Sequence, residues 1–253
     1  MKITFLGTGT SQGVPVIACD CSVCKSSNFK DNRLRSSVFI EFENEKFVID
    51  TGPDFRQQML RAKVKKLDAV LLTHSHKDHV GGMDDVRAFN YFMQKPIDVY
   101  GSNQVLNHIK NEFSYAFAEE RYPGVPEINL HTIENKEFTI NGVKIIPILS
   151  MHYQLPIFGF RIGDFTYITD ANFISEIEKA KIIGSKILVI NALRKKQHIS
   201  HFTLDEALEI IAEVKPEKAY LTHISHQMGL HNEEEKNLPV NVFFAYDGLE
   251  IGL

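Results

Sequence analysis

The sequence predicts an α/β fold in which short apolar strands alternate with amphipathic helices. Three observations lead to this prediction. Apolar runs of strand length, such as residues 69–72, end directly in polar residues. Residues 203–214 repeat apolar side chains with the period of an α-helix. Asn141-Gly142 lies between two apolar runs, which is typical of a type I′ turn that joins two antiparallel strands.

The first half of the chain is predicted to begin with short strands at residues 3–6, 38–42 and 46–49. A helix should follow from Pro53, because proline at the first helical position lacks only an N–H that would have no partner there. Residues 54–60 continue with helical spacing. Strands and helices thus alternate from the start of the chain, as an α/β fold requires.

The second half carries clearer boundary signals. Gly163-Asp164 predicts another hairpin turn. Thr203 is the expected N-cap of the helix at 203–214, and Glu206 completes a capping box with it. No linker, low-complexity tract or internal repeat interrupts the pattern. We therefore expect a single domain over residues 1–253.

Composition limits the classes of function. The 28 basic and 32 acidic residues give a net charge of −4, which argues against a surface for nucleic acids or anionic membranes. No apolar run is long enough to span a membrane, and the N-terminus enters a strand directly instead of forming a signal peptide. We expect a cytoplasmic enzyme without a membrane or nucleic-acid partner, and whether it forms a homodimer stays open.

The most informative segment is residues 73–82, which follow the apolar run 69–72. It places three imidazoles and one carboxylate within six positions, as His74, His76, Asp78 and His79. Burying so many polar groups without partners would cost roughly 1–3 kcal/mol each, and a bound metal removes that cost. Nitrogen together with carboxylate oxygen suits zinc, manganese or ferrous iron better than calcium.

This motif resembles that of the metallo-β-lactamase-fold hydrolases, which form a four-layer αβ/βα sandwich. The resemblance implies that His74 and His76 bind one metal, while Asp78 and His79 bind a second. It also implies a later histidine, a bridging aspartate and a final histidine. Candidates occur in that order, each after a strand-like run: His152, Asp170 and His223.

The three cysteines form a second cluster, Cys19, Cys21 and Cys24. An odd number of cysteines in a cytoplasmic protein argues against a disulfide framework. Three thiolates so close together suit a tetrahedral zinc with one further ligand, for which His226 is the first choice and His231 the second. The alternative is a loop of reduced, metal-free thiols. Cysteines paired with a histidine just beyond the last active-site ligand resemble the PhnP-type phosphodiesterases, near tRNase Z, which carry a structural zinc.

The resemblance implies a hydrolytic mechanism in which two divalent metals, zinc or manganese, share a hydroxide that attacks phosphorus. His201 is the expected proton donor, because it precedes a helix start in a segment that resembles a tRNase Z motif; His198 is the alternative. Asp50 follows the run 46–49 and should either orient a ligand imidazole or cap the next turn. With Asp78 and His201, it completes the expected catalytic set.

The predicted function is hydrolysis of small or cyclic phosphodiesters, such as 5-phosphoribosyl 1,2-cyclic phosphate. The first alternative is a tRNase Z-like endonuclease that processes RNA 3′ ends. Such enzymes usually carry a basic, glycine-rich arm, whereas residues 104–128 mix acidic and aromatic side chains. A further class comprises thioester hydrolases of the glyoxalase II type and non-catalytic metal-binding proteins. The dinuclear motif fits these as well, but the cysteine cluster argues against glyoxalase II.

Overall fold

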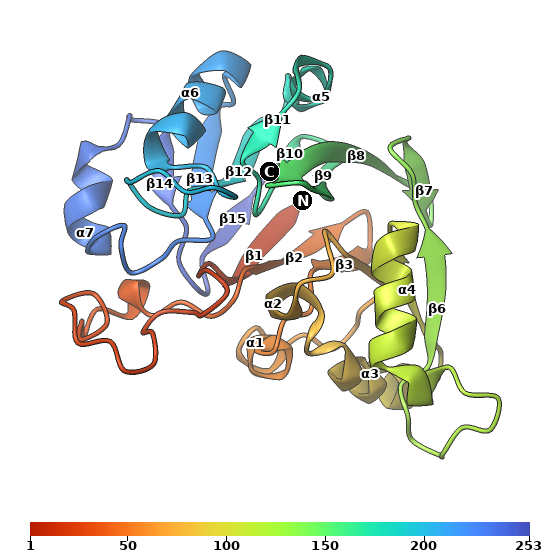
Figure 1. Cartoon of the computed structure of the whole chain (residues 1–253). Coiled ribbons are helices and arrows are strands. Elements are labelled where there is room, and N and C mark those ends of the chain that lie inside the picture. Colours follow the sequence, from red (N-terminus) through yellow and green to blue (C-terminus); the bar gives the residue numbers. More distant parts are fainter.

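The computed structural model describes all 253 residues and contains two β-sheets packed face to face, with helices on both outer sides (Figure 1). The first sheet is built mainly from the N-terminal half of the chain and has seven strands. In spatial order these are β15 (Glu250–Gly252), β1 (Lys2–Gly7), β2 (Ser37–Phe42), β3 (Glu45–Ile49), β4 (Ala69–Leu71), β5 (Ile97–Gly101) and β6 (Ile128–Thr132).

The second sheet has eight strands, all from the C-terminal half of the chain. Its main path runs through β11 (Phe173–Ile174), β8 (Val143–His152), β9 (Leu155–Ile162), β10 (Phe165–Tyr167), β12 (Ile187–Asn191), β13 (Lys218–Thr222) and β14 (Val242–Phe244). The remaining strand, β7 (Phe138–Ile140), pairs with β8. The last strand of the chain, β15, returns to pair with β1, so both ends of the chain lie in the first sheet.

Helices cover the outer face of each sheet. The outer core of the first sheet contains side chains from α1 (Phe55–Arg61), α3 (Arg87–Met93) and α4 (Asn103–Glu112). That of the second sheet contains side chains from α5 (Glu176–Ile182) and α6 (Leu204–Val214). Two one-turn helices, α2 (Lys77–Val80) and α7 (His231–Glu234), lie within loops. Single 3-10 turns occur at Phe29–Asp31, Met83–Val86, Ser114–Ala116 and Glu235–Asn237.

Alternation along the strands explains why the sheets are covered on both faces. On β3, Phe47 and Ile49 enter the core between the two sheets, while Val48 faces the helices outside. On β12, Val189 enters the central core and Leu188 faces the outer helices. Both faces of these strands are apolar, so each sheet needs a second sheet on one side and helices on the other. The fold is therefore the four-layer αβ/βα sandwich of the metallo-β-lactamases.

The strand directions bring several strand ends to one edge. In the first sheet β3, β4, β5 and β6 are parallel neighbours. In the second sheet β10, β12, β13 and β14 are parallel neighbours. Strand β8 is antiparallel to β9, which is antiparallel to β10, so β8 and β10 end at the same edge. Residues just after these strands are therefore placed to meet at the mouth between the sheets.

Most local predictions agree with the observed elements. Asn141 and Gly142 both have positive φ values, 49° and 90°, in the turn between β7 and β8, as a type I′ turn requires. Thr203 caps α6, and Glu206 completes the capping box. The predicted start at Pro53 is wrong: α1 begins at Phe55. Asp54 precedes it without capping it, because its carboxylate is bonded to the backbone and guanidinium of Arg35.

No helix of this structure combines the length and apolarity needed to cross a membrane.

A buried polar network fastens the C-terminal region to the segment before β2. The Arg33 guanidinium donates to Nδ1 of His231 at 3.0 Å, and the backbone N–H of His231 donates to Asp31 at 2.8 Å. Burial, and then the cations of Arg33 and Lys30, lower the pKa of His231 to about 4, against the opposing charge of Asp31. Nε2 of the same imidazole lies 3.4 Å from a Glu235 oxygen. His231 is thus a neutral acceptor inside the fold.

This network should make stability depend on acid pH. His231 has a lower pKa in the folded chain than in the unfolded chain, so its contribution is complete above about pH 6.5 and is lost as pH falls toward about 4. The loss between pH 7.5 and pH 5 should be about 2 kcal/mol. His231→Gln keeps an acceptor for Arg33 and cannot titrate, so urea unfolding should show a smaller loss between these pH values. An equal loss in both proteins would contradict this role.

Candidate active site

The site is assembled from residues that stand at or just beyond strand ends. From the first sheet, Asp50 follows β3, and the motif His74, His76, Asp78 and His79 follows β4 and continues into α2. From the second sheet, His152 is the last residue of β8, Asp170 follows β10, and His223 follows β13. Each of these polar side chains thus stands at the end of an apolar strand or in the segment that follows it.

Three of these residues hold an uncommon backbone conformation. The φ values of Asp50, Asp170 and His223 are 64°, 61° and 55°, in the left-handed region that non-glycine residues rarely adopt. Such conformations cost on the order of 1–3 kcal/mol each and persist only where the surrounding structure enforces them. Their coincidence at three strand ends makes this edge of the sandwich the candidate functional site.

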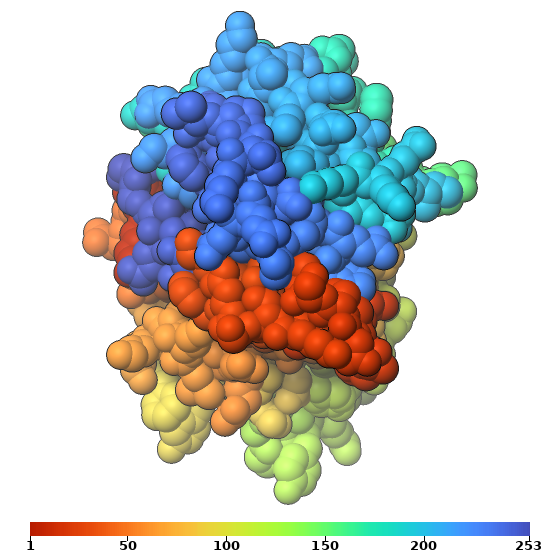
Figure 2. All heavy atoms as spheres, turned by 90° about the vertical axis from the view of Figure 1, so that its left-hand side faces the viewer, coloured from red at the N-terminus to blue at the C-terminus, as the bar shows by residue number.

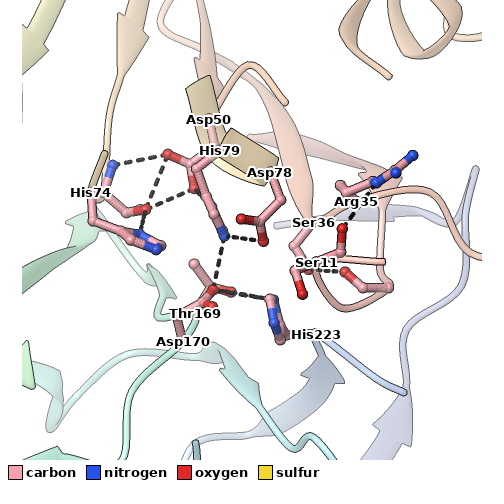
Figure 3. A network of polar contacts seen from close by, with 12 residues as sticks. Ser11, Arg35, Ser36, Asp50, His74, Asp78, His79, Thr169, Asp170 and His223 are labelled. Atoms are coloured by element: carbon pink, nitrogen blue, oxygen red, sulfur yellow. Dashed lines mark hydrogen bonds and ion pairs between the residues drawn. The ribbon is translucent and has the colours of Figure 1, made fainter. Parts of the chain in front are cut away.

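The seven predicted ligands of the dinuclear site come together in two groups. Each group offers ligand atoms that all lie within 4.8 Å of one another. The first group contains His74, His76 and His152, and the second contains Asp78, His79, Asp170 and His223. Asp170 also forms such a group with His152 and His201, so it reaches toward both sets. The structure thus places His74 and His76 in one group and Asp78 and His79 in the other, as predicted, and Figure 3 shows His74 together with the four members of the second group.

Buried nitrogen atoms without partners show that this donor set fits metal ions. Nε2 of His74, His79 and His223 is buried and accepts or donates no hydrogen bond within the protein. Nε2 of His79 lies 3.1 Å from oxygens of both Asp78 and Asp170, but not in hydrogen-bond geometry. Leaving a buried polar atom unpaired costs roughly 1–3 kcal/mol, and few native groups do so. Nitrogen and carboxylate donors that converge without partners suit zinc, manganese or iron.

The electrostatics of the site favour a cation. Burial by itself would lower the pKa of His79, but the carboxylates of Asp170, Asp78 and Asp50 raise it well above its usual value. Burial likewise opposes ionisation of Asp170, and the neighbouring His223 and His79 nevertheless hold the pKa of that carboxyl well below its usual range. Burial also opposes ionisation of Asp78, but His79 holds the pKa of that carboxyl below its usual range, whereas burial raises the pKa of Asp50. The ionised carboxylates of Asp78 and Asp170 beside one imidazole leave an excess of negative charge, which a divalent ion would neutralise.

Hydrogen bonds fix the orientation of the imidazoles. Nδ1 of His79 donates to Asp50 Oδ2 at 2.6 Å, so Asp50 orients the imidazole of a candidate ligand, in the position that one of its two predicted roles requires. Nδ1 of His152 faces the carbonyl oxygens of Asp170 and Ser200 at 2.8 and 2.9 Å. In both residues the Nδ1 hydrogen is engaged by the protein, which leaves Nε2 free for a metal.

His201 lies inside the site and His198 at its margin. The His201 ring is 4.7 Å from that of His152 and 4.9 Å from that of His223, measured between ring centroids. Its Nδ1 is buried without a partner, 3.7 Å from Asp170 Oδ1. Burial, followed by the charge of His223, lowers the pKa of His201 to about 3. The ring of His198 is 5.1 Å from that of His201, and His198 is less deeply buried.

The cysteine cluster is assembled around His226 and not around His231. Nδ1 of His226 lies 3.2, 3.4 and 3.6 Å from the sulfurs of Cys19, Cys21 and Cys24. The backbone N–H of Cys24 donates to the Cys21 sulfur, and this bond lowers the pKa of Cys21 to about 6, whereas burial raises the pKa of Cys24 to about 11. Three sulfurs and one nitrogen around a common point form a donor set that fits zinc.

The cysteine segment lies beside the candidate active site because the loop before it is hydrogen bonded to the residue after His223. Backbone bonds from Thr10 to Ile224 and from Ile224 to Thr8 join the N-terminal loop to the residue after His223. The space-filling view shows the N-terminal segment, in red to orange, against the blue C-terminal segments (Figure 2). A metal at the cysteines would therefore hold the N-terminal loop to the strand end that carries His223.

Sequence reasoning missed the threonines that precede the ligands. The Thr73 hydroxyl bonds Asp50 and contacts His74, and the Thr169 hydroxyl donates to Asp170 at 2.7 Å. The signal was present as a repeated pair of a threonine followed by a ligand, at residues 73–74, 169–170 and 222–223. At the third pair the Thr222 hydroxyl is buried without a partner.

Comparison with known proteins agrees with this geometry. Residues 45–224 match the family model described as the beta-lactamase superfamily domain. The chain superposes with a TM-score of 0.93 on a crystal structure described as a new diphosphatase from the PhnP family, with 37% identity over 100% of this chain and 97% of the other. The chain belongs to the PhnP family of the β-lactamase superfamily. It is thus a hydrolase-family protein with the metallo-β-lactamase fold.

Other relatives are similar to this PhnP-family chain over only part of their own length. An octanoyltransferase of Porphyromonas gingivalis is 39% identical over 99% of this chain, which accounts for 51% of that protein. A ribonuclease Z of Nostoc is 30% identical over 72% of this chain and 51% of its own length. The chain therefore spans about half the length of these curated relatives. Human tRNase Z, short form, shares the fold with a TM-score of 0.71 at 20% identity.

The cysteine cluster of this PhnP-family protein should act on stability more than on chemistry, since its four donors leave no open position for a substrate. Cys21→Ser should remove one tightly held zinc and lower the Tm by about 5 °C or more, while the folded fraction keeps most of its activity. The exposed neighbour Ser22 provides the control, because Ser22→Ala should change neither. Elemental analysis and thermal unfolding measure both effects, and an unchanged zinc content in Cys21→Ser would refute the assignment.

Proposed function

We propose that this protein is a two-metal phosphohydrolase that cleaves a P–O bond in a small phosphodiester or diphosphate. The observation that carries the proposal is the carboxylate of Asp170, which belongs to the second group of candidate ligands and also has an oxygen within 4.8 Å of a ring nitrogen of His152, a member of the first group. Such a pair of sites is the usual arrangement for displacement at phosphorus. The diphosphatase of the PhnP family, similar over nearly its whole length, supports a phosphorus substrate.

Each group of residues has a distinct role in the proposal. The first metal would be held by His74, His76 and His152 and the second by Asp78, His79 and His223, with Asp170 shared. When bound, two divalent ions act as Lewis acids that lower the pKa of water and offset the charge of a phosphate. Burial lowers the pKa of His201 to about 3, so this imidazole is neutral in the free protein. It would become the proton donor to the departing oxygen once the negative charge of a bound phosphate raises that pKa. Asp50 would hold the imidazole of His79 in its ligand orientation.

The distribution of charge favours a small substrate over RNA. An RNA substrate would need many cationic contacts to its phosphates, and each would make binding more sensitive to salt. Between α4 and β6, residues 113–127 contain one arginine and no lysine, against three glutamates. A compact substrate held at the metals needs no such surface. We also infer that the chain acts as one domain over residues 1–253, in the cytoplasm, without a nucleic-acid or membrane partner.

Two other functions, RNA cleavage and thioester hydrolysis, are tested by the same experiment. The ribonuclease Z relatives make pre-tRNA the test for an endonuclease. The relative named octanoyltransferase makes an octanoyl thioester the test for thioester hydrolysis. Because this chain covers about half of that protein, its name is compatible with an activity that resides in the other half.

The deciding experiment is a substrate panel with manganese- and zinc-loaded protein. We expect turnover of bis-p-nitrophenyl phosphate and of a cyclic ribose phosphate or a nucleoside diphosphate, with weak dependence on ionic strength. Asp170→Asn should lose at least one metal and more than about 100-fold of this activity, because a shared ligand is removed. The matched control is Asp164→Asn, in the hairpin between β9 and β10, which should keep both. Specific cleavage of pre-tRNA or of the thioester, without phosphodiester or diphosphate turnover, would overturn the proposal.

The proton-donor role of His201 predicts a dependence on the leaving group. His201→Ala should lower kcat about 10²–10⁴-fold for an alkoxide leaving group and much less for p-nitrophenolate, which departs without a proton. Both metals should stay bound. His198→Ala should cause a smaller loss, because His198 lies further out. An equal loss on both substrates in His201→Ala would exclude proton donation.

A further inference from the structure

Asp50 is fully buried and lies between two ligand imidazoles, His74 and His79 (Figure 3). Its Oδ2 accepts from Nδ1 of His79 at 2.6 Å and from the hydroxyl of Thr73 at 2.8 Å. Its Oδ1 accepts from the backbone N–H of Thr73 at 2.9 Å. One carboxylate therefore contacts a ligand of the second group directly and, through Thr73, reaches the first group.

The Thr73 hydroxyl has a single hydrogen, and this decides the direction of the hydrogen bonds. Oδ1 of Asp50 accepts from the backbone N–H of Thr73, and Oδ2 accepts from Nδ1 of His79, so the carboxyl group serves as an acceptor here and the hydroxyl hydrogen of Thr73 points to it. The oxygen lone pairs of Thr73 then face Nδ1 of His74, 3.0 Å away. His74 must carry its hydrogen on Nδ1 to complete this chain. Its Nε2 is then a bare acceptor, and that atom is the one buried without a protein partner.

We propose that Thr73 is a positioning residue that transmits the orientation set by Asp50 to His74. One buried carboxylate then fixes the tautomer of one imidazole in each metal group: His79 directly and His74 through the hydroxyl of Thr73. The inference rests on the proposed two-metal function. It predicts a selective effect, because loss of the hydroxyl breaks the chain to His74 and leaves the bond between Asp50 and His79 in place.

The chain offers well-matched variants. Thr73→Val removes the hydroxyl but keeps the shape, and it retains the backbone bonds to Asp50 Oδ1 and from Phe158 N–H to the Thr73 carbonyl. Thr73→Ser keeps a hydroxyl. Thr222→Val is the control for burial, since the Thr222 hydroxyl also precedes a ligand at a strand end but has no partner. A general effect of a buried valine would appear in both valine variants.

The first measurement uses the wild-type protein without metal. Long-range ¹⁵N–¹H correlation spectra of histidine-labelled protein should show His74 with its hydrogen on Nδ1. In Thr73→Val the same spectrum should show a mixture of tautomers, and in Thr73→Ser the wild-type form. A wild-type His74 with its hydrogen on Nε2 would overturn the inference without any substitution, and it would leave the proposed hydrolase function untouched.

The second measurement is metal affinity, by competition of manganese and zinc with a chelating dye. In Thr73→Val one of the two active-site ions should bind about 10- to 100-fold more weakly, the usual effect of removing a partner that orients a ligand, while the other keeps its affinity. Thr73→Ser and Thr222→Val should bind both ions as the wild type does. Wild-type affinity for both ions in Thr73→Val would refute the relay. Failure of the wild type itself to bind two ions there would instead refute the proposed function.

Discussion

The structure depends on one electrostatic constraint, the burial of His79 among three carboxylates. Asp50, Asp78 and Asp170 lie 2.6, 3.1 and 3.1 Å from its two ring nitrogens, and each carboxylate comes from a different element of the fold. Buried charges are tolerated only when they are compensated, so none of the three can move without leaving another uncompensated. The contact joins the two sheets, because Asp50 follows β3 of the first sheet and Asp170 follows β10 of the second. The mouth of the sandwich is thereby fixed by polar contacts, while the core below it is fixed by apolar packing.

The same constraint accounts for the strained backbone at the strand ends. Asp50, Asp170 and His223 have positive φ values, which turn the chain sharply after a straight strand. A residue that continued the strand would point its side chain to one face of the sheet. The left-handed conformation departs from that path at the edge where the metal-binding groups converge. Apolar strands on both sides, such as β3 and β12, supply the packing energy that holds these conformations.

The cysteine cluster restrains one strand end of the site from outside it. His226 is only three residues past His223, so whatever holds the cysteines also restrains the end of β13. The N-terminal loop that carries the cysteines is hydrogen bonded to Ile224, between these two histidines. The N-terminal loop, His223 and the cysteine cluster are therefore held together, so a displacement of one would displace the others. A structural metal at this position would contribute to catalysis only by keeping His223 in place.

The sequence by itself determined the early strands near residues 3–6, 38–42 and 46–49, the capping box at Thr203 and the turn at Asn141, because these depend on neighbours in the chain. The resemblance of the motif to the metallo-β-lactamase fold also implied which residues come together in the two groups, and each of the later candidates was found after an apolar run. Tertiary structure alone decided between alternatives that local sequence leaves equal. His226 and not His231 meets the cysteines, because Arg33 and Asp31 hold His231 elsewhere. Asp54 bonds Arg35 and leaves the start of α1 uncapped, and Asp50 bonds His79 and Thr73 through contacts that span more than 20 residues. Such choices depend on which side chains the packing of the two sheets brings within hydrogen-bond distance, and no local pattern encodes that distance.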